Sequence, residues 1–187
     1  MVLRPIIKGF MGELQSKVTQ WLFLDSNIYK NFNNLIINDE KGSTQIDHII
    51  VSKYGIFVIE TKNYSGWIFG NEKSNKWTQN LYGNKKQFQN PLHQNYRHTK
   101  ALAKYLNVSD EKVKPVVIFW GDCEFKTSMP KHVIRGGITG NTNYIKEFKE
   151  VIFTNEEIEK ICTKIKTGKD EMGFLSGLRH AKSVNER

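Results

Sequence analysis

The sequence lacks the features that would place it among disulfide-rich, membrane or secreted proteins. It has only two cysteines, Cys123 and Cys162, and their spacing matches no metal-binding pattern. No stretch approaches the ~18 consecutive apolar residues of a membrane span. The first ten residues also lack the long apolar segment of a signal peptide. We therefore expect a cytoplasmic protein with reduced thiols, and no membrane partner is evident.

Acidic residues are also scarce. The chain has 19 Asp and Glu against 28 Lys and Arg, which gives a formal net charge of +9. A basic excess of this size favours polyanionic partners, and nucleic acid before membranes. Hydrophobic residues make up 39% of the 187 positions, which is enough for the core of one domain.

The spacing of apolar residues predicts alternating helices and strands. Helices are expected over 9–25 and over 90–107, the second beginning at Asn90 and Pro91. Strands are expected over 33–39, 44–51, 56–62, 65–70, 114–122 and 131–137. Two closing helices are expected over 143–153 and 154–168, the second with Thr154 and Glu157 as a capping box. This order predicts an α/β fold with a mixed central β-sheet flanked by helices.

Two carboxylates interrupt an apolar hairpin, "QIDHIIVSKYGIFVIETKN", at residues 45–63. A two-residue turn inside "SKYG" sets the strand register. That register places Asp47 opposite Glu60 and Gln45 opposite Lys62. Paired residues of this kind have Cβ atoms ~5 Å apart and point to the same face. The hairpin therefore predicts a pair of carboxylates with an amine beside it.

Two carboxylates at that separation repel each other, and a divalent cation relieves the repulsion. Oxygen ligands from two acids suit Mg²⁺ or Mn²⁺. A lysine within reach, here Lys62, can orient or activate a water molecule for attack on a phosphate. His48 alternates to the other face and is not counted as a ligand. The alternative is that Asp47 and Glu60 are solvated acids on an exposed face, with Lys62 as a neutralising neighbour.

These residues resemble a known family. Asp47 followed by "ETK" after an apolar strand matches the D-x(n)-[DE]-x-K pattern of the PD-(D/E)xK nuclease superfamily. "GELQ" in the first helix, the glycine turn, "KN-x-x-G" and "NPLHQN" make the chain similar to the nuclease-related domain (NERD) family over residues 9–122. The resemblance implies a restriction-endonuclease-like core over 9–122. We expect residues 123–179 to complete the same domain and 180–187 to form a flexible tail.

The resemblance also implies roles for individual residues. Asp47 and Glu60 would bind Mg²⁺ or Mn²⁺, and Glu13 in the first helix matches an acid aimed at the same metal. Lys62 would position the nucleophilic water and offset charge on the scissile phosphate. Gln94 matches a polar residue on the helix that follows the strands. As a lone residue, Glu13 is equally typical of a solvated helical acid.

Some relatives have a tyrosine four residues after the glutamine, where this chain has His98, and we expect His98 to be a surface residue or a phosphate contact. Helix 90–107 also has a basic stripe at 4–3–4 spacing, formed by His93, Arg97, Lys100 and Lys104. In residues 71–88, Lys85 and Lys86 lie among aromatic residues, a mixture that suits contact with nucleic acid. The alternatives are a solvated helix face and an ordinary hairpin packed on the core.

These inferences lead to a metal-dependent nuclease that hydrolyses phosphodiester bonds in DNA. The alternative function is a DNA-binding or scaffold module that has the fold but little hydrolytic activity. The intact acid–acid–lysine set argues against that alternative. The sequence leaves open whether RNA is also a substrate, whether cleavage is internal or from an end, and the oligomeric state.

Overall fold

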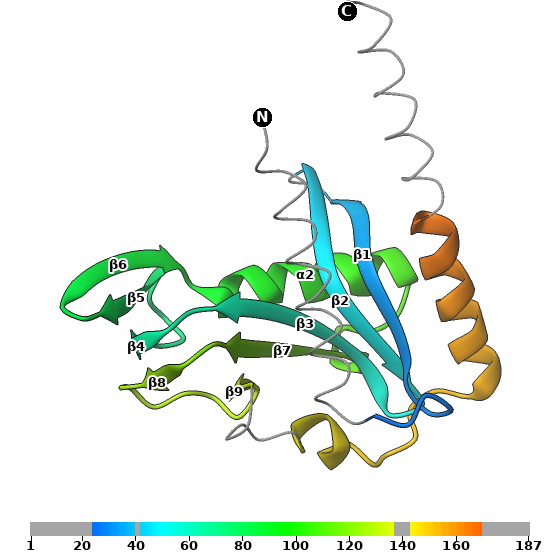
Figure 1. Cartoon of the computed structure of the whole chain (residues 1–187). Helices are drawn as coiled ribbons and strands as arrows, with labels where there is room; N and C mark the ends of the chain where they lie inside the picture. Colours follow the sequence, from blue (N-terminus) through cyan, green and yellow to red (C-terminus); the bar gives the residue numbers. More distant parts are fainter. Residues whose placement is uncertain (1–23, 40–41, 137–142, 170–187) are drawn as a thin grey trace, which may run out of the picture.

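The computed structural model describes residues 24–39, 42–136 and 143–169 (Figure 1). The helix expected over 9–25 lies outside the described residues, except for residues 24 and 25, which are not helical. Glu13 and the tail expected over 180–187 also lie outside them. None of the described helices is both long and apolar enough to cross a membrane.

The main sheet has five strands in the order β1-β2-β3-β7-β9. The strands β1, β2 and β3 pair antiparallel, whereas β3, β7 and β9 pair parallel. The expected mixed sheet in an α/β fold is therefore confirmed. Its strands are β1 (Lys30–Asp39), β2 (Gly42–Ser52), β3 (Gly55–Asn63), β7 (Val113–Trp120) and β9 (Val133–Arg135).

The β2–β3 hairpin has the register that the sequence predicted. Ser52 pairs with Gly55 around the two-residue turn, and the ladder continues as far as His48 and Ile59. Pairing between β2 and β3 stops there, one step before Asp47 and Glu60. Beyond this point β2 pairs only with β1, and that ladder runs on to Gly42.

A second sheet, which the sequence did not predict as a separate unit, has the order β6-β5-β4-β8. It extends β3 and β7 beyond their carboxyl ends (Figure 1). Gly66 lies where the chain passes from β3 into β4, and Gly121 lies where it passes from β7 into β8. Their φ angles are +83° and +133°. A Cβ on either glycine would lie 2.5 Å from a backbone oxygen, so glycine is required at both positions. The strands are β4 (Gly66–Phe69), β5 (Lys76–Leu81), β6 (Asn84–Gln89) and β8 (Cys123–Phe125).

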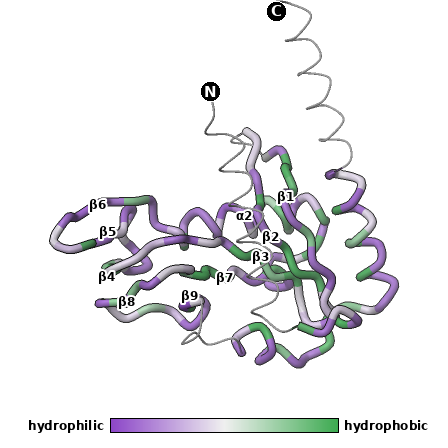
Figure 2. Tube along the Cα trace, viewed as in Figure 1, coloured by the Kyte–Doolittle hydropathy of each residue, from purple (hydrophilic) through white to green (hydrophobic). Residues whose placement is uncertain are grey.

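Helix α2 (Pro91–Leu106) covers one face of the main sheet (Figure 1). The Asn90 side chain caps it by accepting a hydrogen bond from Leu92 N, as the sequence predicted. Leu102 of the helix is fully buried in a cluster that includes Ile49 and Val58 of the sheet. Figure 2 shows the apolar residues concentrated in the main-sheet strands, whereas β6 is mostly hydrophilic.

The prediction of a helix over 143–153 is wrong. Only a short 3₁₀ helix, η2 (Tyr144–Glu147), forms there. The chain then extends because the backbone N–H groups of Ile152 and Phe153 both donate to Lys53 O in the β2–β3 turn. Tertiary hydrogen bonds thus override the local helical pattern.

The last described element is a helix over residues 155–169, and its capping box is confirmed. Thr154 Oγ1 accepts a hydrogen bond from Glu157 N at 3.2 Å, and Glu157 Oε2 accepts one from Thr154 N at 2.7 Å. Ile161 and Ile165 of this helix join the core cluster under α2. A further 3₁₀ turn, η1 (Asp110–Lys112), links α2 to β7.

Candidate active site

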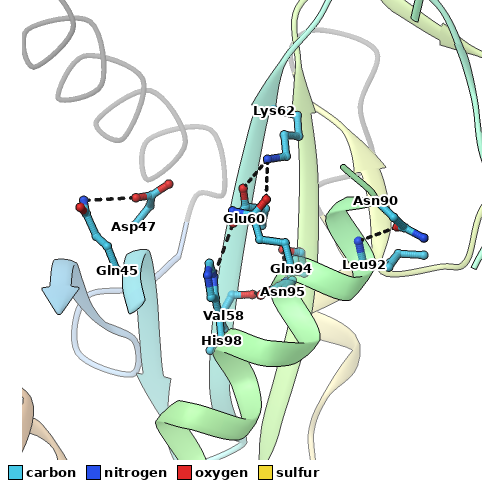
Figure 3. A network of polar contacts seen from close by, with 11 residues as sticks. Gln45, Asp47, Val58, Glu60, Lys62, Asn90, Leu92, Gln94, Asn95 and His98 are labelled. Atoms are coloured by element: carbon cyan, nitrogen blue, oxygen red, sulfur yellow. Dashed lines mark hydrogen bonds and ion pairs between the residues drawn. The ribbon is translucent and has the colours of Figure 1, made fainter. Parts of the chain in front are cut away.

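Glu60 is the centre of the candidate site. It follows the apolar run of β3 and is only 3% exposed, on the face that α2 covers. Its Oε1 lies 2.7 Å from the ammonium nitrogen Nζ of Lys62, two residues along the same strand (Figure 3). Burial raises the pKa of Glu60, while the positive charge of Lys62 lowers it and the negative charge of Asp47 raises it further. A buried acid is thus held beside one amine.

Helix α2 completes the site from the other side. Lys62 Nζ donates to Gln94 Oε1 at 2.9 Å, which fixes the amine between the glutamate and the glutamine (Figure 3). One helical turn further on, His98 Nδ1 lies 3.5 Å from Glu60 Oε2. Gln94 and His98 are four residues apart, so both point from one helix face towards β3.

Asn95 anchors this part of the helix to the sheet. Its side-chain amide donates to Val58 O at 3.0 Å and to Val116 O at 2.9 Å, so it bridges β3 and β7. Pro115, the residue paired with Val58, has no N–H group to donate. Asn95 is fully buried, and its hydrogen bonds hold the neighbouring Gln94 over the end of β3.

Asp47 lies at an irregularity of β2. Asn33 pairs with His48 and Leu35 with Ile46, so Asp47 lies opposite Asn34, which has a left-handed φ of +56°. Ile46 packs in the same core cluster as Ile49 and Val51, whereas Ile50 packs in a different cluster, so side chains do not alternate strictly across Asp47. Burial raises the pKa of the Asp47 carboxyl, and Lys62 partly opposes that rise.

The predicted register placed Gln45 opposite Lys62, but among the described residues these two side chains make no hydrogen bond. Gln45 Nε2 instead lies 3.4 Å from Asn34 Oδ1 and 3.5 Å from Asp47 Oδ1. The reason is that β2 follows β1 after the β2–β3 ladder ends. Gln45 therefore orients Asp47 rather than Lys62 (Figure 3).

The donor chemistry of the site fits a hard divalent cation. Asp47 and Glu60 are carboxylates whose charged forms are both disfavoured by burial, and a cation would offset that cost. Within residues 24–39, 42–136 and 143–169, no three His, Cys, Asp or Glu side chains form a metal-binding group. Two protein carboxylates with further ligands from water and substrate phosphate are typical of Mg²⁺.

His48 takes no part in this donor set. It pairs with Ile59, whose side chain belongs to the core cluster that also contains Ile50. Burial lowers the pKa of His48 to about 4, so its imidazole is neutral at physiological pH. It lies away from Glu60, as the alternation of β3 requires.

The basic residues that the sequence singled out fall into two groups. On α2, His93 Nε2 lies 2.8 Å from the carbonyl oxygen of Glu72, and Lys100 forms an ion pair with Asp110. These two side chains are therefore occupied within the protein. Arg97 is partly exposed and Lys104 is exposed on the same helix, while Lys85 and Lys86 are exposed on β6.

The sequence interpretation was wrong about His98. His98 is only 7% exposed and contacts Glu60, so it is not a surface residue. The one available signal for His98 was its position four residues after Gln94, where it must share the face of that glutamine.

Comparisons with known proteins agree with the geometry. A family model described as the nuclease-related domain matches residues 8–120, which end with β7. A protein of Bacillus anthracis described only as uncharacterized is 38% identical over 167 residues, covering 86% of this chain and 77% of that protein. No solved structure matches the chain significantly.

Proposed function

Because the chain belongs to the nuclease-related domain (NERD) family, we propose that it is a metal-dependent nuclease that hydrolyses phosphodiester bonds in DNA. The observation that supports this most is the buried Glu60 beside Lys62, with Asp47 close enough for its charge to raise the pKa of Glu60. A buried acid with a perturbed pKa and an adjacent amine is typical of a catalytic site rather than a structural one.

In this proposal Asp47 and Glu60 hold Mg²⁺ or Mn²⁺. Glu13, which lies outside the described residues, is the candidate for a third acid on the strength of the family resemblance. The bound cation would polarise the phosphate and lower the pKa of a water ligand. His98 orients Glu60 in the way that outer residues commonly orient metal ligands.

Lys62 is the group that acts on the substrate. Its ammonium holds the attacking water by a hydrogen bond and offsets the negative charge that develops on the phosphate oxygens. Gln94 accepts a hydrogen bond from Lys62, which restricts the amine to the position where it also meets Glu60. The glutamine is thus a positioning residue for the lysine.

The net charge of +9 favours DNA as the substrate. Arg97 and Lys104 on α2, with Lys85 and Lys86 on β6, are the proposed phosphate contacts. Lys100 and His93 are the other proposed contacts on this helix; Lys100 forms an ion pair with Asp110, and His93 Nε2 lies 2.8 Å from the carbonyl oxygen of Glu72. Phosphate contacts of this kind position the strand without selecting its sequence.

One observation favours the second candidate, a DNA-binding module with little hydrolytic activity. Pairing between β2 and β3 ends before Asp47 and Glu60, so the two acids are not held together by the ladder. In a weakly active module, the Glu60–Lys62 ion pair would have only a structural role.

A cleavage assay separates the two candidates. The purified chain is incubated with supercoiled plasmid, linear duplex and single-stranded DNA, each with Mg²⁺, Mn²⁺ or EDTA. We expect cleavage of at least one substrate with either metal and none with EDTA. Intact DNA under every condition, or equal cleavage in EDTA, would contradict the nuclease proposal and favour the binding module.

A further inference from the structure

The second sheet and its β5–β6 turn present aromatic rings to solvent. Among the described residues, four large hydrophobic side chains are exposed, and two of them belong to this sheet. Trp67 in β4 is 49% exposed, and Tyr82 at the β5–β6 turn is 97% exposed. Neither side chain belongs to a core cluster of residues 24–39, 42–136 and 143–169, so packing within that part of the chain does not account for them.

Tyr82 occupies a backbone position that disfavours it. The two-residue turn between β5 and β6 has φ of +50° at Tyr82 and +88° at Gly83. Glycine, asparagine and aspartate suit such positions, whereas a bulky residue in the left-handed region has an energetic cost. Because the ring is 97% exposed, its contacts with the described residues do not offset this cost. The ring is therefore available to a partner.

Trp67 lies in a row of polar and charged side chains. Asn80 of β5 and Glu124 of β8 are its cross-strand partners, and Lys126 Nζ lies 4.7 Å from the centre of its ring. Lys126 also forms an ion pair with Glu124 at 2.6 Å. A pocket of about 750 Å³ is lined by Trp67, Asn80, Glu124 and Tyr82, together with Asp122, Arg135 and their neighbours. That volume lies within the range of pockets for small organic ligands and accommodates a nucleotide.

The charge of the hairpin complements a phosphate backbone. Residues 73–89 contain four lysines and no acid. Lys85 is paired with Asn80, so it continues the row that contains Trp67. We call the row formed by Lys85, Asn80, Trp67 and Glu124 the outer face of the second sheet.

This face lies close to the candidate active site. Lys62 and Trp67 are five residues apart, so their Cα atoms are separated by at most about 18 Å. The second sheet also extends the same end of β3 that holds Glu60 (Figure 1). A strand bound on the outer face is thus only a few nucleotides from the site.

We propose that the outer face of the second sheet binds unpaired DNA next to the scissile phosphate. Trp67 and Tyr82 stack on bases, and Lys85 and Lys126 contact phosphates. Asn80 hydrogen-bonds a base edge inside the pocket. Exposed aromatic rings on a sheet with flanking lysines are a common way to bind single strands, because every base offers a face for stacking. This inference rests on the proposed function, since it assigns the substrate strand of the same enzyme.

Measuring DNA binding under conditions that prevent cleavage tests this inference. Fluorescence anisotropy in EDTA measures the affinity of the full chain for a labelled single strand of about twelve nucleotides and for the matching duplex. We expect Trp67→Ala and Tyr82→Ala each to weaken single-strand binding about 5- to 100-fold. Trp67→Phe and Tyr82→Phe keep an aromatic ring and should bind nearly as tightly as the wild type. Tyr82→Ala alters a fully exposed side chain, so unfolding cannot explain its effect.

Unchanged single-strand affinity in both alanine variants would overturn the inference, and so would tighter binding of the duplex than of the single strand. The outcome is separate from that of the proposed function, because it needs no cleavage. If the wild type failed to cleave DNA with Mn²⁺, the nuclease proposal would be contradicted. If both alanine variants bound the single strand in EDTA as tightly as the wild type, only the DNA-binding role of this face would be contradicted.

Discussion

Glu60→Gln is expected to lower the rate of metal-dependent DNA cleavage by about a hundredfold to a thousandfold. The amide keeps the size of the side chain but removes a negatively charged oxygen ligand, and metal stabilisation of a phosphoryl transition state amounts to several kcal/mol. The measurement is the initial rate of plasmid cleavage with Mg²⁺. Glu111→Gln is the matched control, because Glu111 is exposed on η1, away from the site, and should leave the rate unchanged.

The same substitution should also change how stability depends on pH. The pKa of Glu60 is raised above its usual 4.5, so the folded protein holds this proton more tightly than the unfolded chain does. The contribution of Glu60 to the free energy of unfolding is thus full below pH 4.5 and is lost as the pH rises through the raised pKa. In EDTA, the free energy of unfolding measured with denaturant should therefore fall less with rising pH in Glu60→Gln than in the wild type. Identical pH dependence in the two proteins would contradict the burial and protonation account of Glu60.

Asn95→Ala is expected to lower the free energy of unfolding by about 2 to 4 kcal/mol. The substitution leaves two buried carbonyl oxygens, Val58 O and Val116 O, without the donor that now bridges β3 and β7. An unsatisfied buried polar group costs about 1 to 3 kcal/mol, and total stabilities are only about 5 to 15 kcal/mol. Urea unfolding followed by circular dichroism measures the change.

Tyr96→Ala is the control for this experiment, because Tyr96 is the next residue of α2 and is 59% exposed. Its effect should stay within about 0.5 kcal/mol. An Asn95→Ala protein as stable as the Tyr96→Ala protein would show that water or backbone rearrangement replaces the amide. In that case Asn95 would not anchor Gln94 and His98 over β3.

The parts of the fold that local patterns determine were predictable. The turn at Lys53-Tyr54 sets the β2–β3 register by simple counting, and the ladder from Ser52 to His48 follows it. The start of α2 was predictable because Asn and Pro suit the cap and the first turn of a helix. Continuous apolar residues likewise indicated β7.

The second sheet was not predictable as a sheet for a physical reason. The side chains of β6 are almost all exposed, so its sequence has no apolar alternation for a pattern to detect. Its place is set by distant contacts instead. The Asn90 amide donates to the carbonyls of Asn71, Glu72 and Ser74, which ties the start of α2 to the loop before β5.

The candidate site was predictable in its residue types more than in its contacts. The register was correct from Ser52 to His48, but the predicted pairing of Asp47 with Glu60 does not form, because β2 leaves β3 before Asp47. Strict alternation was assumed, whereas the left-handed Asn34 disturbs it. The contact between His98 and Glu60 depends on where α2 crosses β3, which no local pattern specifies.

The most direct test of the central claim is a calorimetric titration of Mn²⁺ into the full chain. The claim is that Asp47 and Glu60 together hold a divalent cation beside Lys62. We predict that the wild type and Glu111→Gln bind Mn²⁺ with the same affinity, and that Asp47→Asn and Glu60→Gln bind it about tenfold more weakly or not at all. Equal affinity for Mn²⁺ in all four proteins would contradict the claim, because it would show that Asp47 and Glu60 do not bind the metal.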